Sequence, residues 1–185
     1  MNSLILGGIK SGKTRLAERL ASESGKAVVV IATASVEYTA NDPEMAARIE
    51  KHKAVRPQHW RVIEEPIAIS EVIRGCASNE IVIVDCLTLW LTNLLTQNDD
   101  DLLNDQRAQL LNTLKSNSSD VILVSNETSM GIIPLGELTR RFCDEAGTLH
   151  QQLADVSDRV TLCIAGLPHL LKDNLTAKAT PGKTI

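Results

Sequence analysis

The sequence predicts an α/β fold of a single domain, with a doubly wound and mainly parallel sheet. Short runs of Val, Ile and Leu recur along the 185 residues, and they are continuous rather than alternating, which is typical of strands covered on both faces. Helical patterns separate these runs, and strands that alternate with helices form right-handed crossovers and parallel sheets. The predicted strands are Leu4–Leu6, Val28–Ala32, Ile81–Val84, Val121–Val124 and Val160–Ala165.

Four segments carry helical patterns. From Thr14 to Ala21 the apolar residues recur at i and i+4, and the pattern ends near Gly25. Asp42-Pro43 predicts the start of a second helix, because Asp is a favourable cap and Pro suits the first turn. Two further helices are predicted over Leu102–Leu114 and Leu138–Val156.

Expectations for three further segments complete the predicted fold. Gln97–Asp101 is predicted to be a solvated acidic loop, whereas Leu89–Leu95 could face the core or a subunit interface, and we favour the core. The folded domain is expected to cover residues 1–172, and residues 173–185 are expected to form a polar C-terminal tail that frays.

Composition excludes several classes of protein. With 43% hydrophobic and 23% charged residues, the chain is neither disordered nor fibrous. A net charge of −4 argues against a nucleic-acid partner bound through general phosphate neutralisation. The four cysteines form no CxxC pair, so neither a zinc site nor a disulfide framework is expected. No apolar stretch approaches the roughly 20 residues of a membrane span, and the N-terminus lacks the pattern of a signal peptide, so we expect a cytoplasmic protein.

A phosphate-binding motif directly follows the first predicted strand. The segment Gly7-Gly8-Ile9-Lys10-Ser11-Gly12-Lys13-Thr14 matches GxxxxGK[ST] and precedes a helix, which is the context that this chemistry requires. Backbone N–H groups and the helix N-terminus would bind a polyphosphate. Lys13 would reach the β- and γ-phosphates, and the Thr14 hydroxyl would bind Mg²⁺. The sequence therefore predicts a P-loop NTPase fold, of the RecA-like type.

A second carboxylate for the metal is expected at Asp85. It follows the apolar run Ile81–Val84, at the end of a strand where α/β sheets present their ligands. An Asp at this place could also simply cap the next helix. The chain lacks the NKxD and DxxG motifs of regulatory GTPases and the LSGGQ-like segment of transporter ATPases. A small-molecule kinase or a nucleotidyltransferase is the class that remains.

A histidine in a basic segment is the candidate nucleophile. Arg48, Lys51, Lys53 and Arg56 surround His52 in an otherwise acidic chain. Such a cluster attracts a triphosphate and disfavours the imidazolium form, so the ring nitrogen stays available to attack an α-phosphate. His52 could instead merely end its helix and interact with the helix dipole.

Together these residues resemble the bifunctional adenosylcobinamide kinase / adenosylcobinamide-phosphate guanylyltransferase family of cobalamin biosynthesis. The most specific part is the pattern Arg-Ile-x-x-His-x-x-x-Arg-Pro-x-x-Trp over Arg48–Trp60. The resemblance covers the chain to about Lys172, and Cys143 and His150 depart from the family pattern at positions expected to lie away from the nucleotide motifs. The other matching segments are Gly7–Thr14, Ile31–Thr33, Asn126-Glu127, Met130–Pro134, Arg141–Asp144 and Ala165–Pro168.

The resemblance implies specific roles for residues. His52 would carry the guanylyl group and Lys13 would act in catalysis, with Mg²⁺ held by Thr14 and Asp85. The substrates would be ATP or GTP, adenosylcobinamide and adenosylcobinamide-phosphate, and the assembly a homotrimer. The nucleotide-binding residues that it implies are Gly7, Gly8, Ile9, Lys10, Ser11, Gly12, Lys13, Thr14, Thr33, Ala34, Ser35, Lys53, Ala54, Val55, Arg56, Glu64 and Asp85.

Two alternatives remain open from the residues alone. The first is a P-loop kinase of another small metabolite, in which His52 is structural and guanylyl transfer is absent. The second is a nucleotide-dependent switch or binding protein with slow hydrolysis. A guanylylated protein would exclude the first, and stoichiometric product formation with a corrinoid would exclude the second.

Overall fold

The computed structural model describes residues 1–34, 43–44, 47 and 56–177 of the chain. The strands are β1 (Asn2–Gly7), β2 (Ala27–Ala32), β3 (Arg61–Glu64), β4 (Glu80–Asp85), β5 (Asp120–Asn126), β6 (Arg159–Ile164) and β7 (Leu167–Asp173). The helices are α1 (Lys13–Glu23), α4 (Ile69–Arg74), α5 (Leu87–Thr96), α6 (Asp100–Ser116), α7 (Glu137–Val156) and α8 (Asn174–Ala177). Most of the helix expected from Asp42 and most of the expected tail lie outside the described residues.

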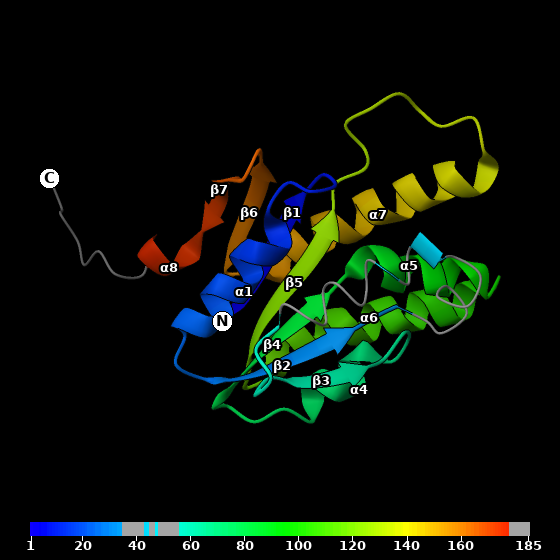
Figure 1. Ribbon diagram of the computed structural model, residues 1–185. Helices are drawn as coiled ribbons and strands as arrows, with labels where there is room; N and C mark the ends of the chain where they lie inside the picture. Colours follow the sequence, from blue (N-terminus) through cyan, green and yellow to red (C-terminus); the bar gives the residue numbers. More distant parts are fainter. Residues whose placement is uncertain (35–42, 45–46, 48–55, 178–185) are drawn as a thin grey trace, which may run out of the picture.

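The strands form a seven-stranded sheet in the order β3-β2-β4-β5-β1-β6-β7 (Figure 1). Every neighbouring pair is parallel except β6 and β7, which are antiparallel. The five predicted strands are β1, β2, β4, β5 and β6, so the mainly parallel α/β fold is confirmed. Since β1 lies between β5 and β6, the phosphate-binding motif emerges from the interior of the sheet.

Both faces of the sheet are covered, which explains the continuous apolar runs. Successive residues of one strand enter different cores: Val28 and Val30 pack with α1, whereas Val29 and Ile31 pack with the helices of the other face. That other face is covered by α4, α5, α6 and α7, while α1 lies on the opposite side of the sheet (Figure 1). The side-chain period of two in a strand therefore places every residue of a central strand in contact with apolar side chains.

Two expectations about the α5–α6 region have different outcomes. Leu89–Leu95 belongs to α5, and Trp90, Leu91 and Leu94 are buried in the core, which confirms the favoured interpretation. The expected loop Gln97–Asp101 is wrong in its second half, because α6 begins at Asp100. The Asp99 side chain accepts a hydrogen bond of 2.9 Å from the Leu102 backbone N–H and caps the helix.

The sequence patterns did not predict the two edge strands or the helices α4 and α5. β3 is short and largely exposed, and β7 is exposed along most of its length, so neither has a continuous apolar run. Asp173, expected in the tail, ends β7 and forms an ion pair of 3.1 Å with Arg159. Among the described residues, no helix is both long enough and apolar enough to span a membrane.

Candidate nucleotide site

The phosphate-binding loop joins β1 to α1, as its motif requires. Gly7 is the last residue of β1, and a Cβ there would lie 2.6 Å from the backbone oxygen of Cys163 on the neighbouring strand β6. Gly12 has a φ of 97°, which a residue with a side chain rarely adopts. The backbone geometry therefore requires glycine at positions 7 and 12. At Gly8 there is no such requirement from space, because a Cβ there would meet nothing within 4 Å.

The turn between β6 and β7 supports the phosphate loop from one side. Ala165 and Gly166 both have positive φ, of 52° and 80°, as a tight two-residue hairpin turn requires. The Gly166 N–H donates a hydrogen bond of 2.9 Å to the backbone oxygen of Ser11. A Cβ on Gly12 would lie 3.1 Å from the Gly166 Cα, so the loop and the turn are in close contact.

The Lys13 side chain is confined inside the phosphate loop. Its Nζ donates a hydrogen bond of 2.9 Å to the backbone oxygen of Gly8, and the residue is only 9% exposed. Burial lowers the pKa of its ammonium group, although Cys86, Asp85 and Cys163 act in the opposite direction. A bound polyphosphate would supply the negative charge that this partly desolvated ammonium lacks.

Ser11 adds an unsatisfied polar group to the same loop. Its Oγ is buried and has no hydrogen-bond partner within the described part of the chain. Buried hydroxyl groups almost always have a partner, and an oxygen acceptor of a bound phosphate would provide one. This orphaned hydroxyl, together with the confined Lys13 ammonium, is the observation that best fits an anionic ligand.

Asp85 ends β4 at the same edge of the sheet and is paired with Arg56. The Arg56 Nη2 lies 2.8 Å from the Asp85 Oδ2, and both side chains are largely buried. Trp60 anchors the arginine segment, because its side chain is buried against the α1 face of the sheet and its backbone N–H donates a hydrogen bond of 3.0 Å to the Pro57 backbone oxygen. The structure therefore brings two predicted site residues together that are 29 positions apart in the chain.

Further predicted residues lie at the ends of β2 and β3. Glu64 is in register with Ala32, and Ala32 is in register with Asp85, so the carboxyl ends of β3, β2 and β4 are aligned. Thr33 is fully buried, and its hydroxyl donates to the Cys86 oxygen at 2.7 Å and accepts from the Cys86 N–H at 2.9 Å. Thr33 thus positions the chain after Asp85, and its predicted contact with nucleotide stays a prediction.

Several predicted residues cannot be placed. His52, Lys53, Ala54, Val55 and Ser35 lie outside the described residues. Ile9 and Lys10 are exposed at the tip of the phosphate loop, and Thr14 and Ala34 are half-buried next to it and to β2. Of the residues that the structure describes, no group of three His, Cys, Asp or Glu side chains could hold a metal ion.

Sequence reasoning missed a polar cluster at the carboxyl end of β5. Asn126 is in register with Gly7, and the Glu127 N–H donates a hydrogen bond of 3.0 Å to the Gly7 oxygen. His150, on α7, lies 2.8 Å from Ser125 through its Nε2. His150 therefore lies beside the strand end that adjoins the phosphate loop. The match of Asn126-Glu127 to the family was the available signal, but β5 had no recognisable motif at its end.

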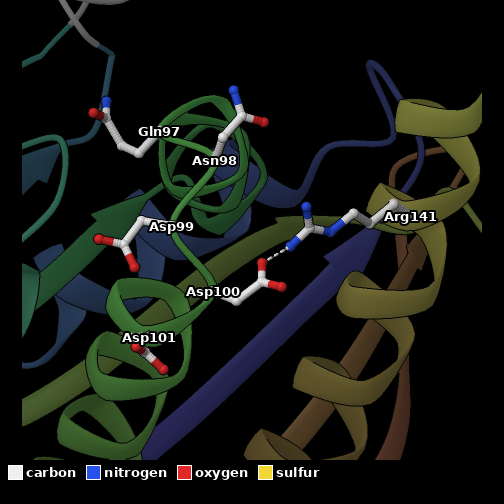
Figure 2. A pocket seen from close by; sticks show the side chains of 6 residues that line it. All are labelled: Gln97, Asn98, Asp99, Asp100, Asp101 and Arg141. Atoms are coloured by element: carbon white, nitrogen blue, oxygen red, sulfur yellow. Dashed lines mark hydrogen bonds and ion pairs between the residues drawn. The ribbon is translucent and has the colours of Figure 1, made fainter.

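A separate depression lies at the α5–α6 turn, and none of its lining residues belongs to the phosphate loop. Figure 2 shows the side chains of Asp99, Asp100 and Asp101 on one side and Arg141 of α7 on the other. Its volume is about 770 Å³, and Arg141 forms an ion pair with Asp100 across it. Gln97 and Asn98 complete the lining. It is open and acidic, so it does not suit a polyphosphate.

The loop, the strand order and the acidic strand end define the class: this is a P-loop NTPase fold of the RecA-like type. The strand that carries Asp85, β4, is separated from β1 by β5, as in that group. The chain belongs to the CobU family, described as cobinamide kinase / cobinamide phosphate guanyltransferase, whose sequence profile matches residues 3–171. The resemblance seen in the motifs is thereby confirmed.

Sequence similarity to two proteins of adenosylcobalamin biosynthesis supports the same family. The chain is 54% identical over 173 residues to the bifunctional adenosylcobalamin biosynthesis protein CobP of Pseudomonas aeruginosa, covering 93% of this chain and 98% of that protein. It is 37% identical over 181 residues to the bifunctional adenosylcobalamin biosynthesis protein CobU of Escherichia coli K12, covering 90% and 97%.

Solved structures show likeness in fold alone. The RadB recombinase has a TM-score of 0.50 and 17% identity, covering 87% of this chain and 73% of that one. The PH0250 protein from Pyrococcus horikoshii OT3 has a TM-score of 0.56 and 12% identity, covering 93% and 86%.

Proposed function

We propose that this enzyme phosphorylates adenosylcobinamide with ATP or GTP and then transfers GMP from GTP to adenosylcobinamide-phosphate, giving adenosylcobinamide-GDP. The phosphate loop, which contains both the confined Lys13 ammonium and the orphaned Ser11 hydroxyl, is the observation that carries this proposal. Membership of the CobU family supplies the substrate class. Each reaction needs a bound nucleoside triphosphate, and one loop can serve both.

In the phosphoryl transfer, Lys13 binds the β- and γ-phosphates and stabilises the charge that develops between leaving and transferred groups. Thr14 and Asp85 would hold Mg²⁺, and their hydroxyl and carboxylate oxygens are the ligand type that this ion prefers. When bound, Mg²⁺ neutralises phosphate charge. The Arg56 guanidinium keeps the Asp85 carboxylate fixed at the strand end.

In the guanylyl transfer, the His52 imidazole attacks the α-phosphorus of GTP, and the bond to the β-phosphate breaks with release of pyrophosphate. The phosphate of adenosylcobinamide-phosphate then attacks the same phosphorus and frees the histidine. Chain geometry supports this assignment: Arg56 is fixed beside Asp85, and it follows His52 by four residues. Four residues of chain span at most about 14 Å, and this short separation in sequence from Arg56 supports the choice of His52 as the nucleophile.

The test is incubation with GTP labelled at the α-phosphate, denaturation, and measurement of label on the protein. The proposal expects acid-labile, base-stable label that disappears in His52→Ala, as a phosphoramidate would. His59→Ala is the matched control, because His59 lies in the same stretch and is exposed. It should keep the label. Absence of label in the wild type, with γ-phosphate still transferred to adenosylcobinamide, would leave a kinase without guanylyl transfer.

A further inference from the structure

The residues at the carboxyl end of β5 adjoin the phosphate loop, and the proposed reactions have not yet used them. Asn126 is in register with Gly7, and Glu127 is the first residue beyond the strand. The hydrogen bond of 3.0 Å from the Glu127 N–H to the Gly7 oxygen fixes this position against the start of the loop. The Glu127 backbone is therefore bonded directly to the segment that would cradle the triphosphate.

The Glu127 side chain is largely buried and partly committed. Its Oε1 accepts a hydrogen bond of 2.7 Å from the Ser129 N–H, while its Oε2 lies 3.7 Å from the Nδ1 of His150. The first contact fixes the rotamer of the carboxylate. The second is longer than a hydrogen bond, and catalytic hydrogen bonds are often long without substrate and tighten when it binds.

His150 faces two groups, one at each ring nitrogen. The residue is 7% exposed, its Nε2 lies 2.8 Å from the Ser125 Oγ, and its buried Nδ1 has no hydrogen-bond partner among the described residues. Burial lowers the pKa of the imidazole, although the Glu127 charge raises it. One neutral tautomer suits both neighbours: Nε2 accepts from the Ser125 hydroxyl, and the Nδ1–H points to the Glu127 carboxylate.

We propose that Glu127 is the general base of the phosphoryl transfer and that His150 is its positioning residue. This inference rests on the proposed function. The carboxylate takes the proton from the attacking alcohol as the alcohol oxygen bonds to the γ-phosphorus. The bond from that phosphorus to the β–γ bridging oxygen breaks, and its electron pair leaves with the nucleoside diphosphate.

Only one of the two reactions needs this base. The alcohol of adenosylcobinamide must lose a proton as it is phosphorylated. By contrast, a neutral imidazole attacks GTP through a free electron pair, and the acceptor of the GMP group is a phosphate that is already anionic. Glu127 therefore acts in the phosphoryl half, and His52 acts in the guanylyl half.

The other described carboxylates at this edge have different commitments. Asp85 is bound to Arg56. Glu65 accepts hydrogen bonds from the Ile67 and Ala68 N–H groups through one oxygen, and it thereby fixes the start of α4. Glu64 ends β3, which is four strands from β1 in the sheet order. Among these described acidic residues, Glu127 is the one whose backbone bonds directly to the last residue of β1.

The first test is Glu127→Gln, which keeps the size and removes the base. We measure transfer of γ-labelled phosphate from ATP to adenosylcobinamide, and guanylylation of the protein by α-labelled GTP. The expected result is a loss of about 10²–10⁴-fold in kcat of phosphorylation, with the KM for ATP changed less than about threefold. Guanylylation should persist. Glu137→Gln, at the exposed start of α7, is the matched control and should behave as the wild type.

The second test separates the two ring nitrogens of His150. An Asn amide nitrogen occupies the place of Nδ1, and a Gln amide nitrogen occupies the place of Nε2. His150→Asn should therefore keep most of the phosphorylation rate, because it can still donate to Glu127. His150→Gln should lose about tenfold in kcat with KM unchanged. A purely structural role would lower both variants in proportion to their loss of thermal stability.

The failures of this inference and of the proposed function are distinguishable. If the wild type phosphorylates adenosylcobinamide but Glu127→Gln does so at an equal rate, the base assignment is overturned and the proposed function stands. If Glu127→Gln loses both reactions equally while it stays folded, Glu127 shapes the shared nucleotide site, which also overturns the assignment. If the wild type shows neither reaction, the proposed function itself fails.

Discussion

The Arg56 Nη2 and the Asp85 Oδ2 lie 2.8 Å apart, and this pair connects two parts of the site that are distant in sequence. Arg56 ends the basic segment that contains His52, and Asp85 ends the strand that is expected to bind the metal. Trp60 secures the arginine side by packing into the core on the α1 face. The Arg56–Asp85 ion pair therefore connects the residues proposed for the guanylyl transfer to those proposed for the phosphoryl transfer.

Replacing Arg56 tests the importance of this ion pair. Arg56→Ala leaves a largely buried carboxylate without its partner, and we expect the free energy of unfolding to fall by about 1–3 kcal/mol. Guanylylation should fall more than phosphorylation, because the segment that carries His52 loses its attachment. Urea unfolding and the two labelling assays measure these effects. Arg61→Ala, which removes an exposed ion pair with Glu80, is the control and should cost less than about 1 kcal/mol. Equal losses in both variants would contradict the idea.

Replacing Lys13 should weaken both reactions. Lys13→Ala removes the ammonium that we propose binds the β- and γ-phosphates, and loss of one such electrostatic contact typically lowers kcat about 10²–10³-fold. Steady-state kinetics of phosphorylation and of guanylylation check this. A variant that loses only one of the two activities would show that they use separate phosphate sites. Lys10→Ala, at the exposed tip of the same loop, is the comparison.

Two glycines should respond in opposite directions to alanine. Gly12→Ala places a Cβ at positive φ and 3.1 Å from Gly166, so we expect a loss of more than about 1 kcal/mol in stability and weaker ATP binding. Gly147→Ala, inside α7, meets nothing within 4 Å and should add about 0.5–1 kcal/mol. Thermal unfolding with and without ATP distinguishes the two. A stabilised Gly12→Ala would mean that the loop relaxes freely.

The pH dependence of the free energy of unfolding should show the contribution of the buried His150 imidazole. Burial lowers the pKa of its imidazole below the ordinary 6.5, so the unfolded chain binds more protons and stability falls as the pH drops below about 6.5. The slope for one group is at most about 1.4 kcal/mol per pH unit. His150→Asn should flatten this part of the profile, measured by urea unfolding between pH 7.5 and 5. An unchanged slope would contradict the assignment.

Asp120 contributes to stability in a more acidic pH range than His150, so it provides a control for the His150 measurement. Burial would raise the pKa of its carboxyl, but Lys26 and the N-terminal amine outweigh that effect and lower it below 3.8. Stability from this group is therefore present above about pH 3.8 and is lost only as the pH falls further. Asp120→Asn should leave the change near pH 6 in place and reduce the acid loss.

Apolar side chains on the loop between β5 and α7 predict association between copies of the chain. Ile132 and Leu135 are each 98% exposed, and Met130 and Ile133 lie beside them. Exposed apolar groups of this size commonly mark interaction surfaces. Ile132→Asp with Leu135→Asp should shift the protein toward monomer in light scattering, while Val62→Asp on the edge strand β3 should not. A monomeric wild type at all concentrations would contradict this prediction.

The sequence predicted the parts of the fold that repeat a simple pattern. Central strands such as Val28–Ala32 appear as apolar runs because both of their faces are buried. The phosphate loop was predictable because its chemistry requires particular residues at fixed spacing. The exposed strands β3 and β7 lack such a pattern, since only their pairing with a neighbour makes them strands.

The long-range contacts of the site could not be predicted in the same way. The pair of Arg56 with Asp85, and the approach of His150 to Glu127, depend on which strand and helix become neighbours in space. The resemblance of Asn126-Glu127 to the family was visible in the sequence, but no pattern in the sequence predicted that His150 of α7 would lie next to Glu127. Local patterns predict elements, whereas these contacts follow from how the elements pack.

The position of β1 in the middle of the sheet affects how the chain folds during synthesis. Its two partners, β5 and β6, are made only after all the residues from α1 to α6 have been added, so β1 stays unpaired on both edges for most of translation. The turn that braces the phosphate loop follows later still, through Gly166 and Ser11. Pairings between distant segments form slowly and expose unpaired edges meanwhile. Truncated chains that end before β6 should therefore lack both one neighbour of β1 and the turn that contacts the phosphate loop.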